Sequence, residues 1–147
     1  MAIPRKILVA TDFSDSSEEA LDYAIGLASR LDAKVYLLNV IGLPLLGVAD
    51  VGIALSPAMI DALVRGNQTE LDRLVERRAP VKIQTLLKTG DVRDVILATA
   101  NEIGADLIVM GTHGRRGLGR ALLGSIAEGV LRHAQVPVLT IHEPKSS

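Results

Sequence analysis

The residues best suited to chemistry in this chain form a glycine cluster at positions 111–125. An apolar run at 106–110 precedes the cluster and predicts a buried strand, and residues 125–133 predict a helix after it. Glycines let backbone N–H groups approach an anion closely, and a helix start adds unpaired donors and a partial positive charge. This order of strand, glycine-rich loop and helix is therefore expected to hold a phosphate group.

The spacing of the cluster separates it from two well-known phosphate loops. Two residues stand between Gly111 and Gly114, and nine stand between Gly114 and Gly124. Ser125 follows directly. Neither the Walker A pattern nor the dinucleotide fingerprint G-x-G-x-x-G fits this spacing. A flexible surface loop is the alternative interpretation.

Charged residues within the cluster also have two interpretations. Arg115, Arg116 and Arg120 either form a solvated face or bring positive charge to an anion site. Arg115 follows Gly114 directly, which favours it as a phosphate contact. We expect His113, a loop histidine beside a glycine, to be solvated rather than catalytic. No two histidines have metal-ligand spacing, so no metal site made by the protein alone is predicted.

Strand-like and helix-like patterns alternate along the chain. Apolar or alternating runs predict five strands, at 6–11, 33–41, 81–87, 106–111 and 136–141. Four helices are predicted between them: one begun by a capping box of Ser16 and Glu19, one at 57–78, one from Asp91 to Gly104, and one at 125–133. This alternation predicts an α/β fold, an open parallel five-stranded sheet with helices on both faces.

The predicted topology brings two candidate loops to one edge of the sheet. In parallel sheets, ligands bind beyond the carboxyl ends of the strands, where the strand order reverses. The first predicted strand ends at Thr11-Asp12, and the fourth ends in the glycine cluster. Asp12 alone predicts a turn or helix cap. The 81–87 strand is less apolar and Pro137 cannot donate to a sheet, so both strands are expected near edges.

Composition limits the possible functions. The 147 residues are expected to form one domain, 1–147, with 143–147 as a loose tail. A net charge of −1 and only three aromatic residues argue against nucleic-acid or membrane binding. The lack of cysteine excludes disulfides and thiolate catalysis. Neither a signal-peptide pattern nor an apolar run of membrane-spanning length is found, which predicts a cytoplasmic protein. The apolar connection at 42–56 is expected to extend the core, with a lid or a partner contact as alternatives.

These features together resemble the universal stress protein family. The resemblance rests on residues 106–114, on the glycine spacing and on Pro137-Val138-Leu139, and it extends back to residues 7–12. The ATP-binding branch of that family carries G-x2-G-x9-G-[ST], which this chain matches without a gap. The resemblance implies a Rossmann-like fold, similar to the adenine nucleotide alpha-hydrolases, and a homodimer that pairs last strands from Val136 to Ile141.

The resemblance also implies a nucleotide pocket for ATP. Gly111 and Gly114 would open the backbone to ribose and phosphates, and the Val40 backbone would read the adenine edge. Asp12 would lie near the ribose or the metal–phosphate region. A carboxylate beside a polyphosphate is repulsive unless a cation intervenes, so Mg²⁺ or Mn²⁺ is expected through phosphates and water. The implied pocket residues are Ala10, Thr11, Asp12, Val40, Met110, Gly111, Gly114, Arg115 and the phosphate-binding N–H groups of Gly124, Ser125 and Ile126.

Three functions stay open at this point. The first is an ATP-gated regulator of a stress response, which the complete glycine spacing favours. The second is a slow ATPase or phosphotransferase using Asp12, His113 and Arg115, although no catalytic lysine motif or paired carboxylates support it. The third is a nucleotide-free dimeric interaction module.

Overall fold

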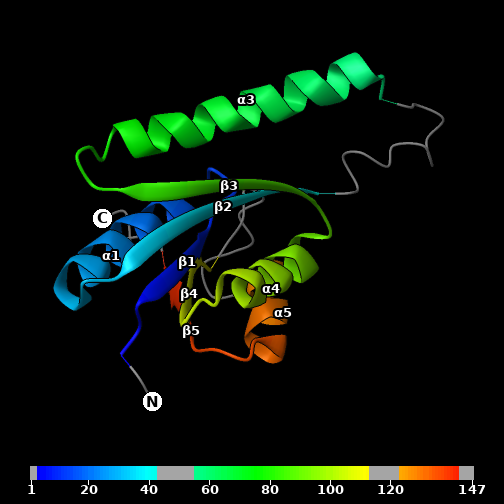
Figure 1. The fold of residues 1–147 in the computed structure, drawn as a ribbon. Coiled ribbons are helices and arrows are strands. Elements are labelled where there is room, and N and C mark those ends of the chain that lie inside the picture. The colour runs from blue at the N-terminus through cyan, green and yellow to red at the C-terminus, as the bar shows by residue number, and fades with distance from the viewer. Residues whose placement is uncertain (1–2, 43–54, 113–122, 143–147) are drawn as a thin grey trace, which may run out of the picture.

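The computed structural model describes residues 3–42, 55–112 and 123–142, in which strands and helices alternate. Figure 1 shows the chain order, which is β1 (Lys6–Ala10), α1 (Asp15–Leu31), β2 (Lys34–Gly42), α3 (Pro57–Glu76), β3 (Ile83–Gly90), α4 (Val92–Ile103), β4 (Leu107–Gly111), α5 (Ser125–His133) and β5 (Val138–Ile141). Every predicted strand and helix is present, with small differences at the ends.

All the strands pair in parallel, in the order β3-β2-β1-β4-β5. The chain moves outward from β1 through β2 to β3, then returns to the other side of β1 and continues to β5. The strand order therefore reverses between β1 and β4, where Ile7 pairs with Leu107 and Val9 with Val109. This confirms the predicted open parallel sheet and brings the carboxyl ends of β1 and β4 side by side.

Helices cover both faces of the sheet, which confirms the predicted layers (Figure 1). One core lies beneath α1 and α3, and a second core lies beneath α4 and α5. The central strand β1 contributes Ile7 and Val9 to the first core and Leu8 to the second, and all three are fully buried. Its unbroken apolar run satisfies both cores because successive side chains of a strand alternate between faces.

Short-range signals set the ends of α4 as predicted, but not the start of α1. Asp91 caps α4 by accepting the Asp94 N–H at 3.0 Å, and Gly104 ends that helix with a φ of 68°. The predicted capping box in α1 is wrong, because Ser14 rather than Ser16 caps that helix. A turn after β1 starts the helix at Asp15, and Ser16 is fully buried in its first turn.

The edge positions of β3 and β5 agree with the sequence prediction. β5 begins at Val138, two residues later than predicted, because Pro137 has no N–H to donate to the sheet. The Pro137 carbonyl still accepts the N–H of Ile108 at 3.0 Å. Pro137 thus precedes the edge strand β5 and contributes only its carbonyl to the pairing with β4.

A tight turn between α3 and β3 shifts two predicted boundaries. α3 ends at Glu76 rather than at 78, since the Arg78 N–H donates to the Val75 carbonyl at 3.0 Å. The Val81 N–H then donates to the Arg78 carbonyl at 3.0 Å and is unavailable to β2. Pairing therefore starts at Ile83, and β3 continues to Gly90.

Candidate functional site

The loop that leaves β1 is held by its own hydrogen bonds. The Thr11 N–H donates to the Leu38 carbonyl at 2.9 Å, and the Phe13 N–H donates to the Thr11 hydroxyl at 3.1 Å. The Ser17 hydroxyl donates to the Ser14 carbonyl at 2.8 Å, so its oxygen accepts from the Thr11 hydroxyl, 3.0 Å away. Both donors of Thr11 are therefore engaged within the chain. Thr11, only 5% exposed, fixes the loop in place.

Asp12 forms the turn that leads into α1. Its Oδ1 accepts the Ser14 N–H at 3.0 Å, which makes an Asx turn. Phe13, between them, adopts a φ of 66°, which is uncommon for a bulky side chain. The turn role of Asp12 is thus observed, and its half-buried carboxylate lies directly beyond the end of β1. Left-handed residues of this kind gather at binding sites.

Gly111 ends β4 against the first turn of α1. A Cβ added to Gly111 would lie 2.2 Å from the Ser16 Oγ and 2.9 Å from the Ser16 carbonyl carbon. Neither separation is possible for a real side chain, so α1 reaches this position because residue 111 is glycine. Glycine at position 111 predicts close approach by a ligand, and the contact with Ser16 gives a packing reason for the same residue.

The helix after the glycine cluster starts beside the end of β4. The Gly124 N–H donates to the Thr112 carbonyl at 2.7 Å, and the Thr112 N–H donates to the Ile141 carbonyl at 3.1 Å. Gly124 is the extended N-cap, and no side chain within the described residues caps α5. The Gly124 N–H is therefore not available to a ligand. Of the three N–H groups predicted to bind phosphate, those of Ser125 and Ile126 are left at the positive end of the helix.

Three predicted site residues, all apolar, lie at the carboxyl ends of three adjacent strands. Ala10 of β1, Val40 of β2 and Met110 of β4 all belong to the core beneath α4 and α5. Leu123, which immediately precedes the cap of α5, packs on the same core. β2 continues past the end of β1, where Ala10 pairs with Leu38, so Val40 lies beyond β1. The fold thus brings together residues far apart in the sequence.

Asn39 belongs to the same region, and the sequence analysis missed it. Its Nδ2 donates to the Thr11 carbonyl at 2.8 Å, and its Oδ1 accepts from the Asn67 Nδ2 at 2.9 Å. Asn39 is only 3% exposed. An asparagine inside an otherwise apolar strand is the signal that could have found it, because a buried amide requires partners.

Part of the predicted site lies outside the described residues. This applies to Gly114, Arg115 and the neighbouring His113, Arg116 and Arg120, and also to residues 43–54 of the apolar connection. In the part of the chain that the structure describes, no group of three or more histidine or acidic side chains could hold a metal ion. Among the described helices, none combines the length and apolar character required to cross a membrane.

An open parallel sheet that reverses its strand order between β1 and β4 defines a doubly wound α/β protein, a class whose members bind ligands at such a switch point. Residues 4–142 match the universal stress protein family. A universal stress protein of Methanocaldococcus jannaschii is 40% identical over 145 residues, covering 96% of this chain and 84% of that protein. This chain belongs to the universal stress protein family, which confirms the resemblance found in the sequence.

Solved structures agree with this assignment. The structure of the hypothetical protein MJ0577 is similar with a TM-score of 0.82 and 26% identity, covering 97% of this chain and 98% of that chain. A universal stress protein in complex with cAMP is similar with a TM-score of 0.66 and 27% identity, covering 97% of this chain and 100% of that chain. The fold is therefore shared over nearly the whole length of each chain.

Proposed function

We propose that this protein belongs to the ATP-binding branch of its family and binds ATP with Mg²⁺ or Mn²⁺ at the carboxyl ends of β1, β2 and β4. The observation that carries the proposal is the start of α5, which the 2.7 Å hydrogen bond from the Gly124 N–H to the Thr112 carbonyl holds at the end of β4 and which no side chain of the described residues caps. The glycine spacing of that branch leads into the same helix start. The relative solved with cAMP supports an adenine nucleotide as ligand.

The phosphates would meet the first turn of α5. The N–H groups of Ser125 and Ile126 and the Ser125 hydroxyl are the donors there, and the helix dipole adds positive potential. Gly114 and Arg115, carried over from the family motif, would complete the phosphate contacts. Charge-assisted hydrogen bonds from an arginine are strong enough to matter at such a site.

The base and ribose would lie over the ends of the strands. The half-buried Ala10 and Val40 would give the base apolar contacts next to the buried Met110, and the Val40 backbone would read the adenine edge. Gly111 would offer only its backbone to the ribose, because Ser16 takes the space of its missing Cβ. Thr11 contributes by position, since both of its donors are already engaged.

Asp12 would face the ribose or the metal-bound phosphates. A divalent ion would be held mainly by phosphate oxygens and water, because Mg²⁺ in nucleotide sites keeps several waters and takes only one or two carboxylates. One carboxylate suits this arrangement, because Mg²⁺ and Mn²⁺ take oxygen ligands and neutralise the repulsion between Asp12 and a triphosphate.

ATP occupancy would act on a dimer edge. Among the described strands β5 pairs only with β4, and a second copy would pair with its outer side from Val136 to Ile141. The Thr112 N–H donates to the Ile141 carbonyl, so the residue that follows β4 is bonded to this edge strand from its inner side. The role proposed for this protein is that of a cytoplasmic, ATP-gated regulator of a stress response. Light scattering at micromolar concentration tests the dimer, and a monomer mass would contradict it.

Thermal unfolding with and without Mg-ATP tests the binding proposal. Ligand at 100 times its dissociation constant adds about 2.7 kcal/mol of stability, which raises the melting temperature of a domain this size by roughly 5 to 10 °C. Gly124→Val is expected to abolish the shift, because its side chain occupies the start of α5. Gly66→Val is the matched control, since nothing lies within 4 Å of a Cβ added at Gly66 on α3. A folded Gly124→Val protein that still binds ATP overturns the proposal.

A further inference from the structure

A chain of side-chain amides connects α3 to the loop beyond β1. The Asn67 Nδ2 donates to the Asn39 Oδ1 at 2.9 Å, and the Asn39 Nδ2 donates to the Thr11 carbonyl at 2.8 Å. Asn39 is almost completely buried, on the face of β2 that carries α1 and α3. Three segments far apart in the sequence are thereby joined by two hydrogen bonds.

The direction of this chain is fixed by the backbone. The Thr11 carbonyl can only accept, so the NH₂ group of Asn39 must face it. The Asn39 oxygen then faces α3, where it requires a donor, and the Asn67 amide supplies one. Asn39 therefore cannot reverse its orientation without breaking the bond to Thr11.

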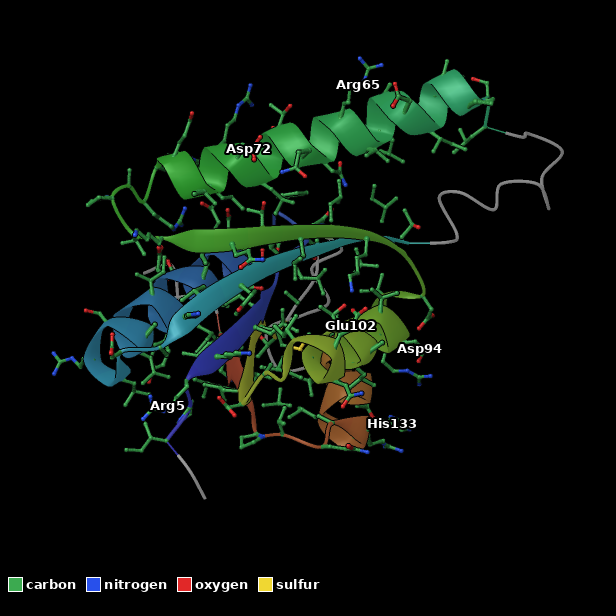
Figure 2. The ribbon with its side chains drawn as sticks, viewed as in Figure 1. Arg5, Arg65, Asp72, Asp94, Glu102 and His133 are labelled. Carbon is green, nitrogen blue, oxygen red and sulfur yellow. The ribbon has the colours of Figure 1, made fainter. Side chains whose placement is uncertain are left out.

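Asn67 occupies the sheet-facing side of α3. Arg65, two residues earlier, projects away from the sheet, as Figure 2 shows. Two residues correspond to about 200° of rotation around a helix, so Asn67 must turn back toward β2. A polar side chain in this position, close to the fully buried Leu71 and nearly buried Leu74 of the same helix, has the Asn39 amide as its hydrogen-bond partner.

We propose that Asn67 is a positioning residue for the nucleotide site, acting through Asn39 on the Thr11 carbonyl and so on the Asp12 turn. This rests on the proposed function and deepens it, because it makes the placement of α3 a determinant of nucleotide affinity. If the Asn67 donor is lost, the buried oxygen of Asn39 is left unpaired, and relief requires movement of Asn39 away from Thr11. The turn that presents Asp12 then loses one of its supports.

Paired variants on α3 test this proposal. Asn67→Leu removes the amide at similar volume. Gln68→Leu is the matched control, because Gln68 donates to Asp72 on the same helix and, among the described residues, to no other element. We expect Asn67→Leu to weaken Mg-ATP binding about fivefold, at the low end of coupling between linked sites. Amide exchange at Phe13 and Ser14, whose N–H groups report on the turn, is expected to become faster. Gln68→Leu is expected to match the wild type in both measurements.

A double variant separates positioning from general packing. With Asn39→Ser the link to Thr11 is already broken, so adding Asn67→Leu is expected to cause no further loss of affinity. A fivefold loss that persists in the Asn39→Ser background overturns the proposal, as does an Asn67→Leu protein with wild-type affinity and exchange. If Asn39→Ser does not fold, the Asn67→Leu and Gln68→Leu pair decides alone. If the wild type binds no Mg-ATP, the proposed function fails, and exchange at Phe13 and Ser14 still decides whether Asn67 positions the turn.

Discussion

Replacement of Gly111 by alanine tests the contact between α1 and β4. The added Cβ would lie 2.2 Å from the Ser16 Oγ, 2.9 Å from the Ser16 carbonyl carbon and 3.0 Å from the Ser16 Cβ. Rotation of the Ser16 side chain relieves only the first of these contacts. The other two involve atoms that move with the backbone, so the first turn of α1 must shift outward.

The expected loss of stability is that of an overpacked contact, because the first turn of α1 has to move to admit the added Cβ. Overpacking of a well-packed region costs about 1 to 3 kcal/mol, which lowers the melting temperature of a domain this size by roughly 3 to 10 °C. The first turn of α1 also holds Ser14 and Ser17, which fix the loop beyond β1. Gly111→Ala is therefore expected to weaken Mg-ATP binding as well as the fold.

Thermal unfolding and calorimetric titration measure the two effects. Gly26→Ala on α1 is the matched control, because nothing lies within 4 Å of a Cβ added there. It is expected to leave ATP binding unchanged and to stabilise the helix by about 0.5 to 1 kcal/mol. Adding Ser16→Ala to Gly111→Ala removes the closest atom and is expected to restore part of the loss. A Gly111→Ala protein with wild-type melting temperature and ATP affinity refutes the packing argument.

Three further changes probe the supports of the site and fold. Ser14→Ala removes the cap of α1, where the Ser14 Oγ accepts the Ser17 N–H at 3.3 Å, and is expected to cost about 1 kcal/mol in thermal unfolding. Hydrogen bonds from two backbone N–H groups at the start of β1 lower the pKa of Asp106 below its ordinary 3.8. The stability that the Asp106 carboxylate adds is therefore fully present above pH 3.8. This stability is lost as the pH falls through the lower pKa of the folded protein. Asp106→Asn is therefore expected to be less stable than wild type near neutral pH, and urea unfolding across the acid range should show the difference shrinking. Arg78→Met breaks the 2.7 Å ion pair from the turn after α3 to Asp22 of α1, and is expected to cost about 1 kcal/mol, less at high salt.

Distinct results would contradict each of these expectations. An unchanged melting temperature for Ser14→Ala would show that the Asx turn starts α1 without the cap. A stability difference for Asp106→Asn that persists undiminished in strong acid would exclude the carboxylate as its source. An Arg78→Met effect independent of salt would point to lost packing by the arginine stem rather than to lost charge.

Residues that act on near neighbours were predicted well. The apolar run of β1, the cap at Asp91 and the left-handed Gly104 depend on spacings of a few residues, so the sequence displays them directly. Pro137 likewise predicted an edge strand, because a missing N–H is a property of the residue itself. The start of α1 was predicted two residues late, since Ser14 and Ser16 carry the same local signal and the Asx turn at Asp12 selects between them.

The amino-acid sequence by itself determined the alternation of strands and helices, the family and the glycine spacing, because these depend on residue type and short-range order. Only the tertiary structure decided that β1 lies beside β4, that Ser16 rests on Gly111, and that Asn67 reaches Thr11 through Asn39. Such contacts join positions 28 to 100 residues apart, and a buried amide or a missing Cβ acquires its partner only when the chain folds around it.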